Sequence, residues 1–232
     1  MGPVVEVRSL KYSYPDGTEA LKGVDFRLEA GEGVALLGAN GSGKTTFALH
    51  LNGLLSGSGA VRICGMEVTP ASLAAIRRKV GMVFQDADSQ LFMPTVIEDV
   101  GFGLLNQGLA PEEVCERAQI ALEQVGMVGT GSRAPHHLSA GEKRRVALAG
   151  ILALDPEILV LDEPTTFLDP PGQRALSDLL RNLPQAKILI THDMPFALAT
   201  CSRAVFFHDG SVAAEGPVEE IAARFGWGFA AR

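Results

Sequence analysis

The sequence predicts an α/β protein built around a parallel sheet, and two patterns carry this prediction. Short, continuously apolar runs at residues 34–37, 80–84, 158–161 and 188–190 are typical of strands that are buried on both faces. Amphipathic helical patterns lie between these runs. At residues 111–125, for example, apolar side chains recur every three or four positions and share one face. Strands that alternate with helices favour a parallel sheet.

The N-terminal segment follows a different pattern. Val24, Phe26 and Leu28 alternate with charged residues, which is the period of two expected of a strand with one buried face. Residues 14–17 (YPDG) supply turn residues in front of this strand. We therefore expect residues 4–28 to form two strands joined by a turn.

The middle of the chain, from residue 86 to residue 154, has mainly helical patterns. Pro111 suits the first turn of a helix, and the acidic residues that follow it complement the helix dipole. A further helix is expected at residues 217–225. We expect a single domain over residues 1–232, with a core at about 1–85 and 155–232 and an inserted helical subdomain at about 86–154.

The composition indicates a globular protein of a reducing compartment. The chain has 232 residues, 47% of them hydrophobic, and 20 Lys and Arg against 27 Asp and Glu give a net charge of −7. This balance argues against a protein that coats nucleic acid, because phosphate neutralisation needs clustered cations. The three dispersed cysteines argue against a disulfide framework or a zinc site. No apolar run reaches the roughly 18 residues that cross a bilayer, and the N-terminus lacks signal-peptide features. A cytoplasmic location is expected.

Residues 38–45 (GANGSGKT) match the phosphate-binding pattern G-x-x-x-x-G-K-[ST], with an apolar strand before them and a predicted helix at residues 46–51 after them. Glycines let the backbone wrap around a phosphate so that N–H groups point at the anion. Lys44 would contact the β- and γ-phosphates, and Thr45 would offer its hydroxyl to Mg²⁺. We expect this loop to bind a nucleoside triphosphate. The candidate nucleotide-binding residues here are Gly38, Ala39, Asn40, Gly41, Ser42, Gly43, Lys44, Thr45 and Thr46.

Two acidic residues follow the apolar run at residues 158–161. Because side chains alternate along a strand, Asp162 and Glu163 are expected on opposite faces and in different roles. Asp162 would hold Mg²⁺ through water, and Glu163 would polarise the attacking water.

Polar residues also follow two other apolar runs. Gln85 comes after the run at residues 80–84, and His192 comes shortly after the run at residues 188–190. Ligands of parallel sheets bind at the carboxyl ends of strands, so we expect these ends to converge with the phosphate loop. Gln85 would ligate Mg²⁺ or orient water, and His192 would reach the γ-phosphate. With Glu163, they are the candidate catalytic residues.

Residues 138–142 (LSAGE) precede a helix that we expect to begin at Lys143. Ser139 and Glu142 have the spacing of a capping box. A capped helix start is also an anion site. The candidate nucleotide contacts in this segment are Ser139, Ala140, Gly141 and Glu142.

The order of these motifs resembles the nucleotide-binding subunit of ATP-binding-cassette (ABC) transporters, over nearly the whole chain. The resemblance rests on the phosphate loop, Gln85, LSAGE, the segment LVLDEP and His192. It implies a P-loop NTPase fold with a RecA-like core, an N-terminal antiparallel β subdomain and an inserted helical subdomain. It also implies ATP hydrolysis with ATP and Mg²⁺ as cofactors. The implied metal-binding residues are Thr45, Gln85 and Asp162.

The resemblance further implies a head-to-tail dimer, formed with a second copy or with a paralogous ATPase. ATP would lie between the phosphate loop of one subunit and the LSAGE segment of the other, and residues 168–169 would cross between the sites. Tyr14 would stack on adenine, and Tyr12 is the less favoured partner. The sequence departs from the family at Ala140, where glycine is usual. Its backbone would approach the γ-phosphate less closely unless the methyl group points away.

A narrower resemblance is to the ATPases of energy-coupling-factor importers, particularly the cobalt/nickel type, in residues 83–109 and 138–170. It implies a peripheral subunit on the cytoplasmic face of the cell membrane. A transmembrane coupling subunit would dock near Gln85, and a separate membrane subunit would bind the substrate. The apolar residues 91–94 (LFMP) would line the docking groove, with a buried turn as the alternative.

Other functions remain open on the sequence. A vitamin importer, such as one for biotin, would use the same type of ATPase. A soluble ABC ATPase of DNA repair or translation is disfavoured, because the chain has one cassette and no room for a long coiled coil after Gln85. A phosphate-loop kinase would not need LSAGE. We expect no metal-transport site in this chain, since the adjacent His136 and His137 would not face one ligand together.

Overall fold

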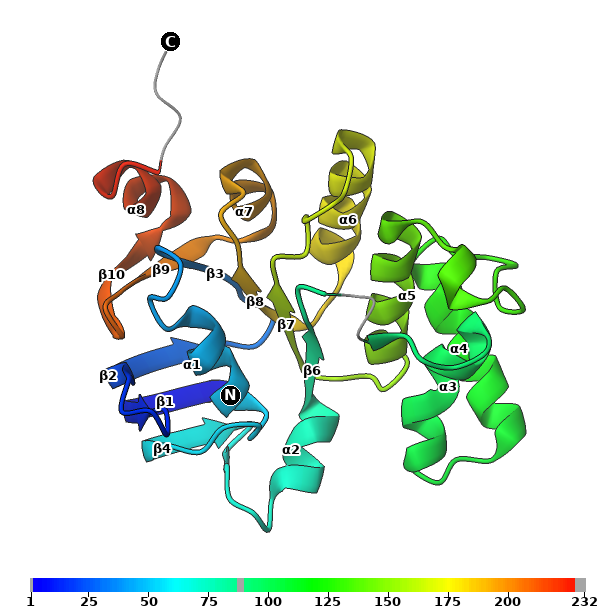
Figure 1. Ribbon diagram of the computed structural model, residues 1–232, viewed down its shortest axis with the longest axis horizontal. Coiled ribbons are helices and arrows are strands. Elements are labelled where there is room, and N and C mark those ends of the chain that lie inside the picture. Colours follow the sequence, from blue (N-terminus) through cyan, green and yellow to red (C-terminus); the bar gives the residue numbers. More distant parts are fainter. Residues whose placement is uncertain (1, 87–89, 228–232) are drawn as a thin grey trace.

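The computed structural model describes residues 2–86 and 90–227, and its strands form two sheets (Figure 1). A four-stranded sheet has the order β2-β1-β4-β5 and is antiparallel. A six-stranded sheet has the order β10-β9-β3-β8-β7-β6 and is parallel except for the edge pair β10–β9. The strands are β1 (Val5–Ser13), β2 (Glu19–Leu28), β3 (Gly33–Leu37), β4 (Ser58–Ile63), β5 (Met66–Glu67), β6 (Val80–Val83), β7 (Ile158–Asp162), β8 (Ala186–Ile190), β9 (Arg203–His208) and β10 (Ser211–Pro217).

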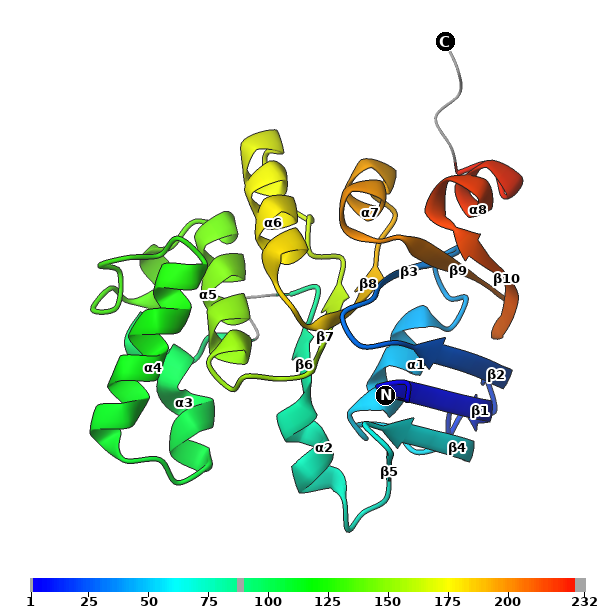
Figure 2. The ribbon, with the colours of Figure 1, turned by 180° about the vertical axis from the view of Figure 1, so that it is seen from behind.

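The helices α3, α4 and α5 pack against one another on the side of the molecule opposite the antiparallel sheet (Figures 1 and 2). The helices are α1 (Lys44–Leu51), α2 (Leu73–Lys79), α3 (Val96–Asn106), α4 (Pro111–Gln124), the short 3₁₀ helix η2 (Pro135–His137), α5 (Ala140–Leu152), α6 (Pro170–Asn182), α7 (Met194–Thr200) and α8 (Val218–Arg224). The helix α5 begins three residues earlier than expected, because Ser139 caps it.

Two hydrophobic cores lie on the two faces of the parallel sheet. Val34 and Leu36 of β3 pack with the antiparallel sheet and α1, whereas Ala35 and Leu37 of the same strand pack with α3 to α8. All four side chains are buried, which explains why this strand reads as a continuously apolar run.

The helical group shares one of these cores with the sheet. Val100 of α3 and Leu148 of α5 belong to the same hydrophobic cluster as Leu161 of β7. The helical group is therefore packed onto the same hydrophobic core as one face of the parallel sheet. The predicted start of this subdomain, at about residue 86, adjoins residues 87–89, which lie outside the described residues.

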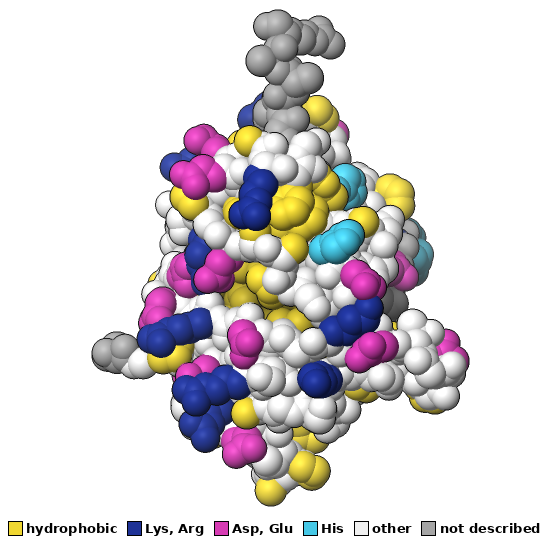
Figure 3. Space-filling view, turned by 90° about the vertical axis from the view of Figure 1, so that its left-hand side faces the viewer, with side chains coloured by type: hydrophobic (Ala, Val, Ile, Leu, Met, Phe, Trp, Pro, Cys, Tyr) yellow, Lys and Arg dark blue, Asp and Glu magenta, His cyan; other side chains and the backbone are white. Residues whose placement is uncertain are grey.

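The end of the molecule that carries the antiparallel sheet presents basic and acidic side chains side by side (Figure 3). Ion pairs join its elements: Lys22 of β2 lies 2.7 Å from Asp209, and Arg203 of β9 lies 2.7 Å from Glu32. Within residues 2–86 and 90–227, no helix has both the length and the apolar character that crossing a bilayer requires.

Candidate functional site

The phosphate loop joins β3 to α1, and its path requires glycine at two positions. Gly38 has a φ of 136° and Gly43 a φ of 103°. A Cβ at Gly38 would lie 2.2 Å from the Phe207 carbonyl oxygen, and one at Gly43 would lie 2.7 Å from the Ala20 carbonyl oxygen. The loop therefore lies directly against β9 and β2, where no side chain fits.

Lys44 folds back over the phosphate loop and is only 8% exposed. Its Nζ donates to the carbonyl oxygens of Gly38 at 2.7 Å and Ala39 at 2.9 Å. Burial lowers the pKa of this ammonium, and the carboxylates of Glu163 and Asp162 oppose that shift. The loop thus holds a positive charge at the amino-terminal end of α1, where the helix dipole also favours an anion.

A cavity of about 510 Å³ brings most of the sequence-predicted site residues together. It lies where the phosphate loop meets the carboxyl ends of the strands, as expected of a parallel sheet. The predicted residues that line it are Tyr14, Asn40, Gly41, Gly43, Lys44, Thr45, Thr46, Gln85, Asp162, Glu163 and His192. Gly38, Ala39 and Ser42 do not line the cavity, although Gly38 and Ala39 hold the Lys44 ammonium.

Thr45 and Asp162 are in direct contact within this cavity. The Thr45 hydroxyl donates to Asp162 Oδ2 at 2.9 Å, and Gln85 lines the same space. Burial raises the pKa of the Asp162 carboxyl, and the hydrogen bond from Thr45 opposes this shift. Hydroxyl, carboxylate and amide oxygens are the ligands that Mg²⁺ prefers. The residues present therefore fit a magnesium ion.

Glu163 lies just beyond the strand and has a φ of 46°. Its N–H donates to the Ile190 carbonyl at 2.8 Å, and its Oε2 lies 2.9 Å from His192 Nδ1. The prediction that Asp162 and Glu163 point to opposite faces is wrong, because β7 ends at Asp162 and the alternation of a strand does not extend to Glu163. Both side chains line the same cavity.

Tyr14, rather than Tyr12, lines this cavity. The hydroxyls of Tyr14 and Thr46 are hydrogen-bonded at 2.9 Å, which ties the tyrosine to α1. Tyr12 lies behind it, with its ring edge-on to Tyr14 at 5.1 Å and to the buried His50 at 4.9 Å. The exposed aromatic face available to a ligand in the cavity is therefore that of Tyr14.

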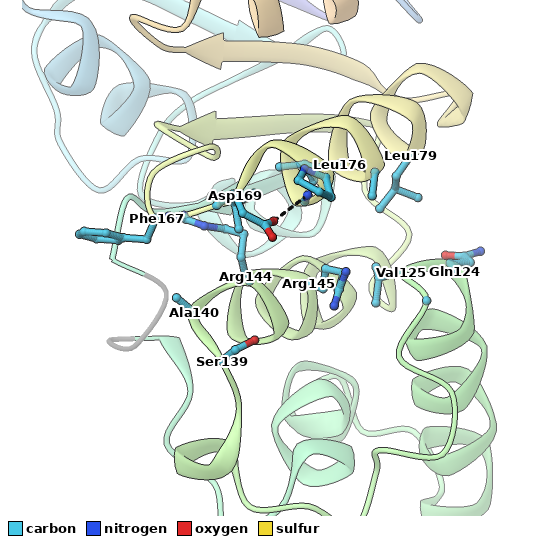
Figure 4. A pocket seen from close by; sticks show the side chains of 16 residues that line it. Gln124, Val125, Ser139, Ala140, Arg144, Arg145, Phe167, Asp169, Leu176 and Leu179 are labelled. Carbon is cyan, nitrogen blue, oxygen red and sulfur yellow. Dashed lines mark hydrogen bonds between the residues drawn. The ribbon is translucent and has the colours of Figure 1, made fainter.

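The LSAGE segment lies elsewhere. Ser139, Ala140 and Gly141 line a different cavity of about 720 Å³, between α5 and α6 (Figure 4). Phe167 and Asp169 also line it, and Asp169 Oδ1 caps α6 by accepting from the Gly172 N–H at 2.9 Å. A single chain therefore does not bring LSAGE to its own phosphate loop.

Glu142, the fourth predicted contact of this segment, closes the capping box at the start of α5. Its Oε2 accepts from the Ser139 N–H at 2.8 Å, and its Oε1 lies 2.8 Å from Arg133 Nη1. The N–H of Ser139 and the guanidinium of Arg133 lower the pKa of the Glu142 carboxyl to about 2. Both contacts of Glu142 are therefore to residues of its own chain, and Glu142 lines neither of the two cavities described above.

Comparison with known proteins decides the family. Residues 21–166 match the family model described as ABC transporter. The chain belongs to the ABC transporter ATPases. A relative from Streptomyces avermitilis, described as an ABC transporter ATP-binding protein, is 54% identical over 222 residues, which cover 95% of this chain and 85% of the relative. The energy-coupling factor transporter ATP-binding protein EcfA of Methanosphaera stadtmanae is 48% identical over 227 residues, covering 95% and 82%.

Solved structures agree with this assignment. CbiO1 from Clostridium perfringens, part of the ABC transporter complex CbiONQ, has a TM-score of 0.88 and 36% identity, covering 97% of this chain and 92% of that one. A dimeric ATP-binding cassette in a post-hydrolysis state, bound to ADP and phosphate, has a TM-score of 0.83 and 29% identity, covering 92% and 98%. The predicted P-loop NTPase fold, the ATPase activity and the resemblance to cobalt-type energy-coupling-factor ATPases are confirmed.

Some residues in or near this ABC ATPase cavity could not be recognised from the sequence. Thr18, Glu19 and Ala20 line the cavity because β2 returns beside Tyr14 after the turn. The YPDG turn could have indicated that return. Arg144 follows Lys143, where the sequence predicts only the start of a helix, yet Arg144 is buried and donates to the backbone of Gln85.

The apolar cluster after Gln85 divides between the core and the surface. Leu91 packs against the hydrophobic core, as the alternative of a buried turn predicts. Phe92 is 63% exposed, and its ring lies edge-on to that of Phe102, 4.9 Å away. Phe102 and Leu105 of α3 are also exposed, so an apolar surface is present here.

The adjacent histidines lie in η2, with ring centroids 4.2 Å apart. Among the residues that the structure describes, no group of three or more His, Cys, Asp or Glu side chains is arranged to hold a metal ion.

Proposed function

We propose that this ABC ATPase is the ATP-binding and ATP-hydrolysing subunit of an energy-coupling-factor importer for cobalt or nickel ions. Mg-ATP binding would close a head-to-tail dimer, and hydrolysis would reopen it and drive transport. The observation that carries the proposal is the cavity in which the phosphate loop, Asp162, Glu163 and His192 converge. The similarity to EcfA and to CbiO1 supports the choice of importer.

Within this proposal Glu163 polarises the attacking water. Its Oε2 is within hydrogen-bond distance of His192 and accepts from the Thr191 hydroxyl at 3.4 Å, so two neighbours orient the carboxylate. His192 is itself exposed enough to reach the γ-phosphate. Mg²⁺, when bound, would neutralise charge on the phosphates, and Thr45, Asp162 and Gln85 would hold it.

The position of the LSAGE segment supports a dimer. Because Ser139 and Gly141 lie on a different cavity from Lys44, only a second ATPase chain could bring such a segment to this nucleotide. Residues 168–169 would then cross between the two sites. The partner would be a second copy of this chain or a paralogue.

The exposed surface formed by Phe92, Phe102 and Leu105 supports a partner in the membrane. We propose that the transmembrane coupling subunit docks there and holds the ATPase at the cytoplasmic face of the membrane, while another membrane subunit binds the substrate. Apolar surface of this kind favours protein contact, since burying one large side chain contributes roughly 1.5–3 kcal/mol.

Replacing Phe92 with Glu tests the docking surface. Because Phe92 is largely exposed, Phe92→Glu should leave folding and basal ATP hydrolysis intact but release the ATPase from its membrane partners. The measurement is co-purification from detergent-solubilised membranes, alongside an ATPase assay. Val128→Glu, at another exposed apolar residue of the helical group, is the matched control and should keep the complex. Retained membrane association with lost hydrolysis would show that Phe92 serves the fold instead.

The transported substrate can be tested with the complete complex. We expect Co²⁺ or Ni²⁺ to stimulate ATP hydrolysis by the ATPase purified with its membrane subunits, and biotin to have no effect. Stimulation by biotin alone would assign the chain to a vitamin importer.

A further inference from the structure

We infer that Arg144 is a positioning residue that couples the two nucleotide sites of the dimer. It connects the loop of Gln85, which lines the cavity of its own chain, to the helix that carries LSAGE, which would serve the nucleotide of the second chain. This inference rests on the proposed head-to-tail dimer.

Arg144 lies on α5, about one helical turn after Ala140. Its side chain turns away from solvent and the residue is 3% exposed. Nη1 donates to the Phe84 carbonyl oxygen at 2.7 Å, and Nη2 donates to the Gln85 carbonyl oxygen at 2.7 Å. One planar guanidinium thus holds two successive backbone carbonyls, which a single ammonium cannot do with the same geometry.

The backbone at Phe84 and Gln85 has no strand neighbour to supply these bonds. The ladder of β6 with β7 ends at Val83, and β6 is the edge strand of its sheet. The Gln90 side chain bonds two other backbone groups of this segment, accepting from the Phe84 N–H at 3.0 Å and donating to the Met82 carbonyl at 3.2 Å. Without Arg144, two carbonyls would lose strong, charge-assisted partners.

A displacement of Gln85 would therefore be transmitted to α5. The helix is held along its length by buried residues such as Val146 and Leu148, so it moves as a unit rather than bending at Arg144. Its first residues are those of LSAGE. Binding of Mg-ATP that draws Gln85 into the cavity of one chain would thus shift the LSAGE segment of that chain at the other nucleotide. Arg144 of the second chain would transmit the same movement in the opposite direction.

Coupling of this kind predicts cooperative hydrolysis. Two coupled sites allow a Hill coefficient for ATP that rises above one and has two as its limit. In Arg144→Met the Hill coefficient should fall to one. The kcat should fall on the order of 10²-fold, as expected when a catalytic group is misplaced by about an ångström. Mg-ATP affinity of the isolated monomer, measured by calorimetry, should change far less than the kcat, because Arg144 itself does not line the nucleotide cavity.

Two further variants make the test specific. Arg144→Lys keeps the positive charge with less disturbance of folding, and should show a Hill coefficient between those of the wild type and Arg144→Met. Arg117→Met makes the same chemical change at an exposed ion pair on α4 and should behave as the wild type.

A Hill coefficient of one in the wild type, or one that both Arg144 variants leave unchanged, would overturn the inference. A merely structural role would lower the melting temperature of these variants without changing that coefficient, which also overturns it. Failure of the proposed function is a different result, because the wild type would then neither hydrolyse ATP nor dimerise with it.

Discussion

At the scale of single residues, Phe167 combines a left-handed backbone with a large, exposed side chain. Its φ is 65° and the residue is 83% exposed. Figure 4 shows its ring pointing away from the helices α5 and α6. A left-handed conformation costs an L-amino acid roughly 1–2 kcal/mol, and in the single chain no burial of the ring offsets that cost.

Phe167→Gly should therefore stabilise the isolated chain. Relief of the left-handed backbone, less the entropy that glycine adds to the unfolded chain, should give a gain of up to about 1 kcal/mol. For a chain of this size that corresponds to a rise in melting temperature of about 2–4 °C. Phe167→Ala is the control, because its Cβ keeps the strain. Equal melting temperatures for the two variants would contradict this account.

The sequence could predict the site residues whose position is determined by the neighbouring strand, loop and helix. The glycines of the phosphate loop follow from the strand, the helix and the spacing between them. The direction of the Glu163 side chain could not be predicted, because it depends on a backbone hydrogen bond from Glu163 to Ile190 in a neighbouring strand. Arg144 could not be singled out either, because a Lys-Arg-Arg stretch is typical of a solvated surface. Which of these three side chains turns inward depends on how α5 is rotated about its axis relative to Phe84.

At the scale of elements, the start of α5 is fixed by the capping box and by Arg133. Because the pKa of Glu142 in the folded chain is about 2, against an ordinary value of 4.5, its charge contributes stability above pH 4.5. That contribution is lost as the pH falls from 4.5 towards 2, since the carboxyl then binds a proton more readily in the unfolded chain.

Glu142→Gln should keep the shape of the capping box but remove this charge. We expect the variant to be less stable than the wild type at pH 7, and the difference to shrink as the pH is lowered from 4.5 to 3. Urea unfolding at several pH values measures this. A stability difference that does not change with pH would show that the charge of Glu142 contributes nothing.

The apolar runs predicted four strands of the parallel sheet, because burial on both faces removes polar residues from them. Their order could not be predicted in the same way. The strand β3 lies between β8 and β9, which follow it by about 150 residues, and only tertiary packing determines that neighbourhood.

At the scale of the whole molecule, one chain keeps its phosphate loop and its LSAGE segment apart. The phosphate loop and Glu163 share one cavity, and the LSAGE segment lines another. Under the proposed head-to-tail dimer, two chains would meet around the nucleotide and bring these two segments together. We therefore propose that Mg-ATP itself brings the two chains together.

The most direct test uses Glu163→Gln, which keeps the shape of the side chain but removes the carboxylate proposed to polarise the attacking water. Hydrolysis should fall by roughly 10²–10⁴-fold, so ATP should persist and hold the closed dimer. Size-exclusion chromatography with light scattering should show a monomer without nucleotide and a dimer with Mg-ATP. The double variant that adds Lys44→Ala should stay monomeric, because it lacks the cation that would contact the phosphates. A Glu163→Gln protein that stays monomeric with saturating Mg-ATP, or that hydrolyses ATP at a near-normal rate, would contradict this account.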